Sequence, residues 1–259
     1  MTSATSNEIG LNAVIVAVTD GAPRVLTVER EAMTAPALPA PLDKWADSHF
    51  ALPFGPFEPG AHRTLDLGVR RWVEEQTGLN LGYVEQLYTF ADRHRDPREL
   101  AGGPRIVSIG YLALVREAQP HGEGPAEWIN GYSFFPWEDW RDGKPEMIDA
   151  IIRPQLFQWI DLAGNARKRA RRAERVSIAF GSEDAGWDFE RVLERYELLY
   201  EAGLVTESVR DHAIGALQKF ADKPDSDSIP TDDDRLAALA ATGRPLELDH
   251  RRILATALG

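Results

Sequence analysis

The stretch that decides the fold is residues 51–79, which read ALPFGPFEPGAHRTLDLGVRRWVEEQTGL. Its second half predicts an amphipathic helix over 64–77, because the side chains that would share one helix face recur at helical spacing: Leu65, Val69, Trp72, Val73 and Gln76. Gly78 follows the last of them and provides a turn that ends the helix.

Strand-like runs lie on both sides of this helix. NAVIVAVTDGAPRVLTVER (12–30) reads as two strands joined by a hairpin at Asp20-Gly21. Strands are predicted in YVEQLYTFAD (83–92) and RIVSIGYLALVR (105–116), and a short strand followed by a turn in each of HFALPFGPF (49–57) and YSFFPWEDW (132–140). MIDAIIRPQLFQWIDLA (147–163) reads as a helix with a break at Pro154. Strands that alternate with helices up to about residue 160 predict an α/β domain.

The composition excludes several classes of protein. The chain has 259 residues, 43% of them hydrophobic, which is enough to build a sizeable core. It has no cysteine, so disulfides and thiolate metal sites are excluded. No apolar run reaches the length of a membrane span, and the N-terminus does not read as a signal peptide, so we expect a cytoplasmic protein without a membrane partner. The formal net charge of −12 argues against non-specific binding of nucleic acid by the chain as a whole.

The composition changes after about residue 160. A basic helix is predicted at 166–176, and an apolar helical stripe follows within 189–200. Residues 222–234 form an acidic linker rich in Asp, Pro and Ser. The last residues place Ile253, Leu254 and Leu258 on an apolar helix face. Two interpretations of this terminus stay open: a longer native chain that continues past it, or a C-terminal helix that docks on the domain.

Residues 51–79 resemble the signature of the Nudix hydrolase superfamily. Gly55 corresponds to its leading glycine, and Gly78-Leu79 to its closing pair. Three further positions match the signature, namely Arg71, Val73 and Glu75. Three acids of the signature are absent: Ala61, Trp72 and Gln76 stand in their places. The spacer between Ala61 and Arg71 has nine residues where the family has seven.

The absent acids matter because positions 72, 75 and 76 share one helix face. Three carboxylates there would hold Mg²⁺, a hard cation that prefers oxygen ligands and bridges to phosphate. With Trp72 and Gln76 in place, only Glu75 remains, so the resemblance implies a weak metal site at best and no catalytic residues in the helix. No cofactor would be required for binding, and Mg²⁺ only for hydrolysis.

A second resemblance is carried by EQLYTFADRHRDPR and RIVSIGYLALV within 85–115, and by LELDHRRILATALG (246–259). These segments are similar to ADP-ribose pyrophosphatases, and more closely to the Nudix-related transcriptional regulators of bacterial NAD metabolism. The resemblance implies a Nudix α/β/α sandwich with a mixed sheet over 1–160, closed by a helix within 246–259. Residues 161–245 would be a helical insertion, and a winged-helix DNA-binding domain would follow the chain.

Candidate ligand-binding residues besides Arg71 and Glu75 lie in the loop after residue 90. Arg93, Arg95 and Arg98 have guanidinium groups that suit a pyrophosphate, and the alternative is a solvated charged loop. Tyr111 would stack on an adenine, or belong to the core.

The basic helix supplies candidates for contact with DNA phosphate: Arg167, Lys168, Arg171 and Arg172. The alternative is a solvated helix with acidic partners. His62 and His94 have no metal-ligand partners at helical or hairpin spacing, and both are expected at the surface.

Three functions are therefore possible. The favoured one is a sensor that binds ADP-ribose or a related NAD-pathway nucleotide, acts through a DNA-binding domain and forms a homodimer. The second is an active Mg²⁺-dependent ADP-ribose pyrophosphatase that uses relocated acids: Glu58, Asp66, Glu74 or Glu75. The third is a dimerisation scaffold without a ligand.

Overall fold

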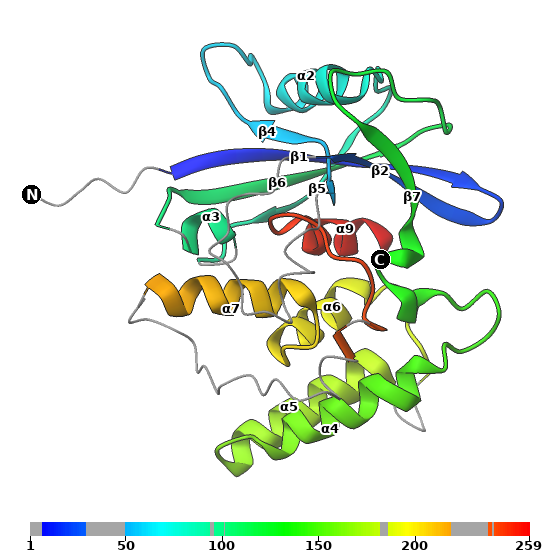
Figure 1. The fold of residues 1–259 in the computed structure, drawn as a ribbon, viewed down its shortest axis with the longest axis vertical. Helices are drawn as coiled ribbons and strands as arrows, with labels where there is room; N and C mark the ends of the chain where they lie inside the picture. The colour runs from blue at the N-terminus through cyan, green and yellow to red at the C-terminus, as the bar shows by residue number, and fades with distance from the viewer. Residues whose placement is uncertain are drawn as a thin grey trace, which may run out of the picture.

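The centre of the protein is a mixed seven-stranded sheet, seen edge-on in Figure 1. The computed structural model describes residues 7–29, 50–93, 96–100, 102–181, 186–218, 238–239 and 241–259. Strands β1 (Asn7–Thr19) and β2 (Ala22–Glu29) form the predicted hairpin. Asp20 and Gly21 between them have φ values of 52° and 71°, as a tight hairpin turn with two left-handed residues requires.

The remaining strands extend the sheet from this hairpin. They are β3 (Phe50–Ala51), β4 (Phe54–Pro56), β5 (Glu85–Phe90), β6 (Arg105–Leu114) and β7 (Ala126–Asn130). The main path runs β3-β2-β1-β6-β5, while β4 pairs with β1 and β7 pairs with β2. The β1–β6 pair is parallel and all other pairs are antiparallel, so the sheet is mixed as predicted.

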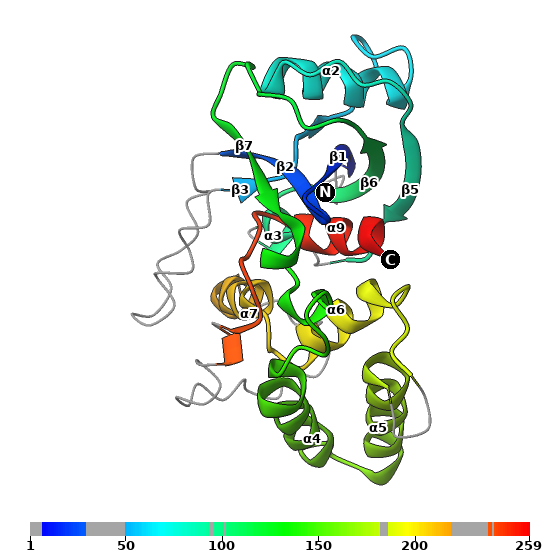
Figure 2. The ribbon, with the colours of Figure 1, turned by 90° about the vertical axis from the view of Figure 1, so that its right-hand side faces the viewer.

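Helices cover both faces of the sheet, which confirms the predicted α/β/α arrangement. Helix α2 (Leu65–Thr77) lies on one face and α9 (His250–Leu258) lies on the other (Figure 2). Ile253 and Leu254 of α9 are buried. The apolar face noted at the end of the sequence is thus docked beneath the sheet.

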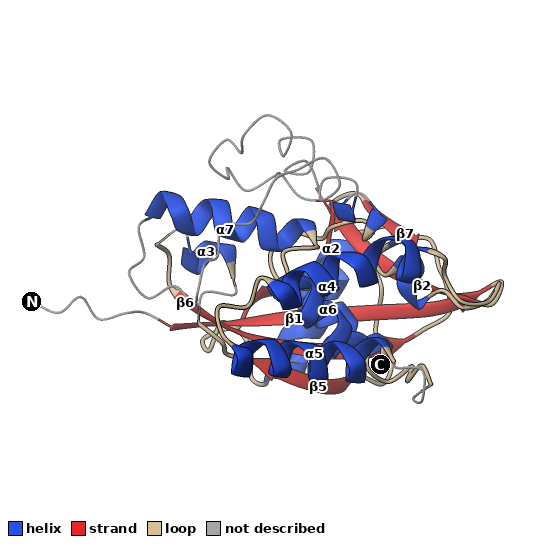
Figure 3. Ribbon diagram, turned by 90° about the horizontal axis from the view of Figure 1, so that it is seen from below, coloured by secondary structure: helices blue, strands red, loops and turns tan. Residues whose placement is uncertain are grey.

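A further helical layer lies beyond α9 (Figure 1), and in the view from below its helices lie in front of the sheet (Figure 3). It contains α4 (Arg153–Asp161), α5 (Ala166–Phe180), α6 (Val192–Glu201) and α7 (Thr206–Gln218), and the short α3 (Pro97–Leu100) packs against α7. The break expected near Pro154 is a π-helical turn at Ile148–Ile152, directly before α4. The acidic linker 222–234 lies outside the described residues.

The segment 132–140 contains no strand, so that part of the prediction was wrong, whereas the turn predicted with it is present. The strand β7 precedes it, and two 3₁₀ turns follow, at Gly131–Ser133 and Pro136–Glu138. The Asn130 side chain accepts a hydrogen bond from the backbone N–H of Tyr132 and so starts the first turn. Pro136 has no N–H for a ladder and begins the second.

The helical layer and the sheet share one hydrophobic core. A single cluster of buried side chains includes Val14 and Val25 of the sheet, Leu254 of α9, Leu199 of α6 and Phe180 of α5. The apolar stripe of 189–200 therefore finds its partner within its own chain, although Phe189 stays exposed. The division into a domain of 1–160 and an insertion of 161–245 stays a prediction.

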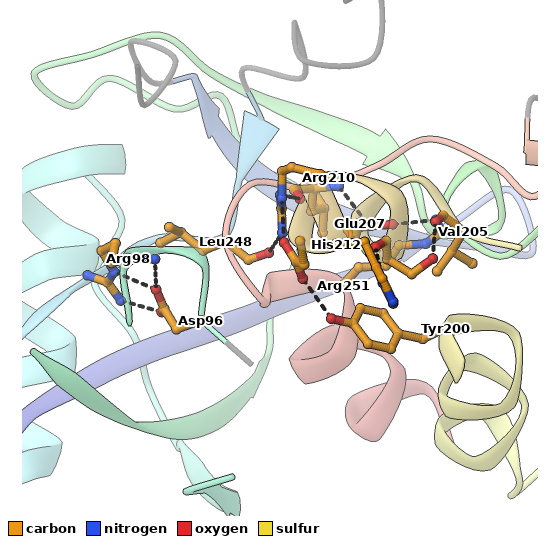
Figure 4. A network of polar contacts seen from close by, with 12 residues as sticks. Asp96, Arg98, Tyr200, Val205, Glu207, Arg210, His212, Leu248 and Arg251 are labelled. Carbon is orange, nitrogen blue, oxygen red and sulfur yellow. Dashed lines mark hydrogen bonds and ion pairs between the residues drawn. The ribbon is translucent and has the colours of Figure 1, made fainter. Parts of the chain in front are cut away.

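Buried ion pairs reinforce the contact between α9 and the helical layer (Figure 4). The Arg251 guanidinium, fully buried, donates to the Glu207 carboxylate at 3.2 Å and to the carbonyl oxygen of Thr242. Arg210 of α7 donates to Asp211 at 2.8 Å and to the carbonyl oxygen of Leu248 at 2.7 Å. These bonds connect α7 to the segment that leads into α9.

Candidate functional site

Helix α2 is positioned by its two ends and its buried face. The Thr64 hydroxyl accepts a hydrogen bond from the N–H of Leu67 and caps the N-terminus. Gly78 adopts a left-handed conformation with φ of 71° and closes the C-terminus. Gly68 allows close packing on the sheet, because a Cβ there would lie 2.7 Å from Leu11 Cδ1. The helix predicted over 64–77 is therefore confirmed.

Trp72 stands where the signature has an acid, and it packs on strand β4. Its indole N–H donates to the carbonyl oxygen of Pro56 at 2.9 Å. Its ring lies against Gly55, where an added Cβ would come within 2.2 Å of ring atom Cε2. The leading glycine of the signature thus gives the indole room to approach the strand.

Gln76, the second substituted position, bonds to the backbone of the same strand. Its amide nitrogen donates to the carbonyl oxygen of Phe54 at 2.6 Å, and its amide oxygen accepts from the N–H of Phe54 at 3.1 Å. A carboxylate has no donor, so it would make only one of these two bonds. The amide at this position holds α2 to β4.

Glu75 is the acid of the signature that remains, and it forms an ion pair on the helix surface. Arg71 Nε donates to Glu75 Oε1 at 2.7 Å, and both side chains are substantially exposed. The hydrogen bond to Glu75, together with its negative charge, raises the pKa of the Arg71 guanidinium above its ordinary value. Asp66 is likewise paired, with Arg70 at 2.9 Å.

The residues of this helix do not fit a Mg²⁺ site. Trp72 contributes a ring, the Gln76 amide is bonded on both sides to Phe54, and Glu75 already faces Arg71. Among the residues that the structure describes, no three His, Asp or Glu side chains come together as metal ligands. Ala61, at the first acid position, is exposed and offers no side-chain oxygen.

His62 is buried, so its predicted surface position was wrong. Its side chain is 4% exposed, and Nδ1 accepts a hydrogen bond from the N–H of Glu58 at 3.1 Å. The turn over 58–62 folds the imidazole between Phe57 and Trp72, with ring centroids 5.9 Å from each. A turn brings these aromatic rings together without any periodic signal in the sequence. His94 lies outside the described residues.

The arginines of the loop after β5 that the structure describes do not lie near α2. Arg98 lies in α3, on the opposite face of the sheet from α2 (Figure 1), and its guanidinium makes two bonds to Asp96 at 2.9 and 2.7 Å. Arg93 is exposed in the turn after β5, and Arg95 lies outside the described residues.

Tyr111 is buried beneath α2 rather than open to a ligand. It is 5% exposed, and it packs in the hydrophobic cluster between α2 and the face of the sheet that α2 covers. Burial, and then the charge of Asp66, raise the pKa of its hydroxyl. The tyrosine therefore occupies the core position that was the alternative to adenine stacking.

The four basic candidates divide between two faces of α5. Arg167 and Arg171 are exposed, and Lys168 is half-buried. Arg172 is buried: its guanidinium lies over the Trp159 ring at 4.2 Å and donates to the Trp159 carbonyl oxygen at 2.6 Å. It does not face solvent, because α5 packs along α4.

One part of the site has no counterpart in the sequence predictions. The loop around Gly122 closes over the C-terminal end of α2. The backbone N–H of His121 donates to the carbonyl oxygen of Thr77, and that of Glu123 donates to the backbone carbonyl oxygen of Glu75, both at 3.0 Å. A Cβ at Gly122 would lie 2.3 Å from the Gln76 carbonyl carbon. The only sequence signal was a glycine in a polar loop.

Solved structures similar to this chain include Nudix domains. The Nudix domain of Shewanella oneidensis NrtR, complexed with ADP ribose, is 22% identical with a TM-score of 0.39, and the match covers 48% of this chain and 73% of that one. S. oneidensis NrtR complexed with a 27mer DNA is 22% identical, with a TM-score of 0.38 and coverage of 59% and 63%. A bifunctional NMN adenylyltransferase/ADP ribose pyrophosphatase from Francisella tularensis is 19% identical, with a TM-score of 0.33 and coverage of 50% and 35%.

These overlaps are partial. The chain spans about half, 52%, of S. oneidensis NrtR in a further structure of that protein. No protein-family model matches the sequence, and no curated protein matches it significantly. No helix in the described part of the chain is long and apolar enough to cross a membrane. Each of these matches has a TM-score of 0.39 or less, and the matched part of the chain is similar to the Nudix domain of S. oneidensis NrtR.

Proposed function

We propose that this chain is a catalytically degenerate Nudix-fold sensor, which binds ADP-ribose or a related NAD-pathway nucleotide without hydrolysing it. The observation that carries the proposal is the pairing of Trp72 and Gln76 with the backbone of β4. Both substituted positions are built into the contact between helix and strand. The helix therefore lacks the cluster of carboxylates that holds a hydrolytic metal ion.

The ligand would be held by charge and by backbone donors. The exposed Arg71 guanidinium suits a diphosphate, which would compete with Glu75 for its N–H groups. Such contacts stabilise a pyrophosphate but do not generate hydroxide. A ligand that survives binding can report its own concentration, which is what a sensor requires.

The proposal is tested by incubating the purified chain with ADP-ribose and Mg²⁺. We expect a rise in melting temperature with ADP-ribose and no release of AMP. Turnover on the order of 1 s⁻¹, an ordinary enzyme rate, would show that other carboxylates hold the metal and that the chain is a pyrophosphatase. The absence of both a thermal shift and turnover would favour the scaffold without a ligand.

A designed variant tests the chemistry of the helix directly. Trp72→Glu with Gln76→Glu places three carboxylates on one helix face, and we expect measurable Mg²⁺ affinity by calorimetry where the wild-type chain has none. The matched control, Trp72→Gln with Gln76 retained, removes the indole but adds no charge and should not gain affinity. The proposal would be contradicted if the wild-type chain and the control bound Mg²⁺ as tightly as the double variant does.

The regulatory part of the proposal concerns the whole protein. We infer that ligand binding controls transcription of NAD-metabolism genes, through a DNA-binding domain outside this chain, and that the protein acts as a homodimer. A monomer mass in light scattering over a wide range of protein concentrations would contradict the proposed homodimer.

A further inference from the structure

We propose that the outer face of α5, formed by Arg167 and Arg171, is a docking surface for the phosphate backbone of nucleic acid. The surface lies at the end of the molecule farthest from α2 (Figure 1), so it is separate from the nucleotide site. The proposal does not depend on nucleotide binding, and its test needs no nucleotide.

The basic residues of α5 divide by helix geometry into two sets. Positions 168, 172 and 175 follow helical spacing and turn toward the neighbouring helices. Arg172 stacks on Trp159 of α4, and Arg175 makes two bonds to the Glu201 carboxylate of α6 at 2.5 and 2.7 Å. These side chains fix α5 in place on both sides.

Arg167 and Arg171 lie on the solvent-exposed side of α5, and neither forms an ion pair within the described part of the chain. They are spaced one turn apart, about 6 Å along the helix axis, and both are exposed. Within the described residues, neither guanidinium forms an ion pair or a hydrogen bond that holds it, in contrast to Arg172 and Arg175. Their charges point away from the packed face of the helix.

The position of these charges in the helix is unfavourable for folding. The N-cap of α5 is Asn165, so Arg167, Lys168 and Arg169 fall in or beside the first turn, where the macrodipole is already positive. The same turn contains no acidic residue. These basic residues lower the stability of the helix, and Arg167 and Arg171 form no ion pair within the described residues. Both observations are consistent with an anionic binding partner.

The chemistry of the two guanidinium groups, rather than the net charge of the chain, favours a phosphate backbone as that partner. The chain as a whole is acidic, with a formal charge of −12. A local basic face on such a chain attracts a polyanion to one place and repels it elsewhere. Guanidinium groups make forked bonds to phosphate oxygens, and a duplex presents these oxygens in a regular row.

The test measures binding of the whole chain to a fluorescent 30-base-pair duplex at several salt concentrations by anisotropy. We expect Arg167→Glu with Arg171→Glu to weaken binding at low salt at least tenfold. Loss of two phosphate contacts should also lower the slope of log affinity against log salt by about 1.8. The matched control, Arg63→Glu with Arg116→Glu, makes the same change in net charge at two exposed arginines outside α5 and should change affinity less than threefold.

Stability separates a docking role from a structural one. If the outer arginines only served the fold, the α5 variant would melt earlier. We expect the opposite, a melting temperature equal to the wild type or about 1–3 °C higher, because Arg167→Glu places a carboxylate in the first helical turn and Arg171 is exposed beyond it.

Three results would overturn the proposal. The first is no duplex binding by the wild-type chain at low salt. The second is an equal loss in the α5 variant and the control, which would show that net charge alone matters. The third is binding to vesicles containing phosphatidylserine without binding to the duplex, which would identify a membrane surface as the partner.

Discussion

At the scale of single residues, Gln76 shows how one side-chain amide can hold a helix to a neighbouring strand. Its amide makes a donor and an acceptor bond to one backbone unit, that of the buried Phe54. The glutamine amide can donate to the backbone carbonyl and accept from the backbone N–H at the same time, whereas a carboxylate can only accept. Gln76 thus joins α2 to β4 through a donor bond and an acceptor bond.

We expect Gln76→Ala to lower the free energy of unfolding by about 1–3 kcal/mol, because it removes both bonds to a buried backbone unit. Urea denaturation monitored by circular dichroism measures the change. The exposed neighbour Glu74 provides the control, since Glu74→Ala removes a side chain of similar length and should change stability by less than about 0.5 kcal/mol. Equal effects of the two substitutions would show that the Gln76 bonds contribute nothing.

At the scale of elements, a buried ion pair connects a 3₁₀ turn to the helical layer. Arg195 of α6 is fully buried and makes two bonds to the Glu138 carboxylate, at 2.6 and 2.8 Å. The same guanidinium donates to the carbonyl oxygen of Ala179 and lies over the Trp187 ring. Burial nevertheless raises the pKa of the Glu138 carboxyl, and the bonds from Arg195 oppose this only in part.

The raised pKa predicts a pH dependence. As the pH rises above the unfolded pKa of glutamate, about 4.3, the unfolded chain loses the Glu138 proton before the folded chain does. The contribution of Glu138 to the free energy of unfolding therefore falls through the window up to its folded pKa. The stability of the wild type relative to Glu138→Gln should decrease as the pH rises across this window.

Asp139 provides a control of opposite sign. The hydrogen bond from Arg141 lowers the pKa of the Asp139 carboxyl, so its contribution is present above the unfolded pKa and disappears as the pH falls. The stability of the wild type relative to Asp139→Asn should therefore increase with pH. Calorimetric melting at a series of pH values measures both differences, and a shared sign would contradict the assignment for Glu138.

At the scale of the whole molecule, the sheet and the helical layer share a continuous core. Buried side chains run from the strands through α9 to α6 and α5 without interruption. The buried pairs of Arg251 with Glu207 and Arg195 with Glu138 lie within this contact. We therefore expect the two layers to unfold together as one cooperative unit.

Leu199→Ala, in the helical layer, tests this cooperativity. It should lower the free energy of unfolding by about 2–5 kcal/mol, and it should shift the loss of β-sheet and helix signals in circular dichroism and infrared spectra together. The control is Ile178→Ala on α5, where the side chain is 51% exposed and the change should stay within about 0.5 kcal/mol. Separate transitions for sheet and helix would show two independent units.

Sequence patterns were sufficient for most of the local structure, but not for the segment 132–140. The hairpin at Asp20-Gly21, the helix 64–77 and the basic helix after Asn165 depend on turn residues, caps and periodicity, which act over a few residues. The sequence alone also showed that Ala61, Trp72 and Gln76 stand where the resemblance would place acids, because this depends only on which residue occupies each position.

The tertiary structure decided what those residues contact. The sequence placed Trp72 and Gln76 on one face of a helix, but only the packing of that helix against β4 showed that both bond to the strand. Likewise, His62 was expected at the surface, and Tyr111 and Arg172 were candidates for contact with a ligand or with DNA. All three are buried, His62 by a turn and the other two by packing against neighbouring elements. Periodicity reports which side chains share a face, whereas burial depends on what covers that face, and that is determined by contacts between segments far apart along the chain.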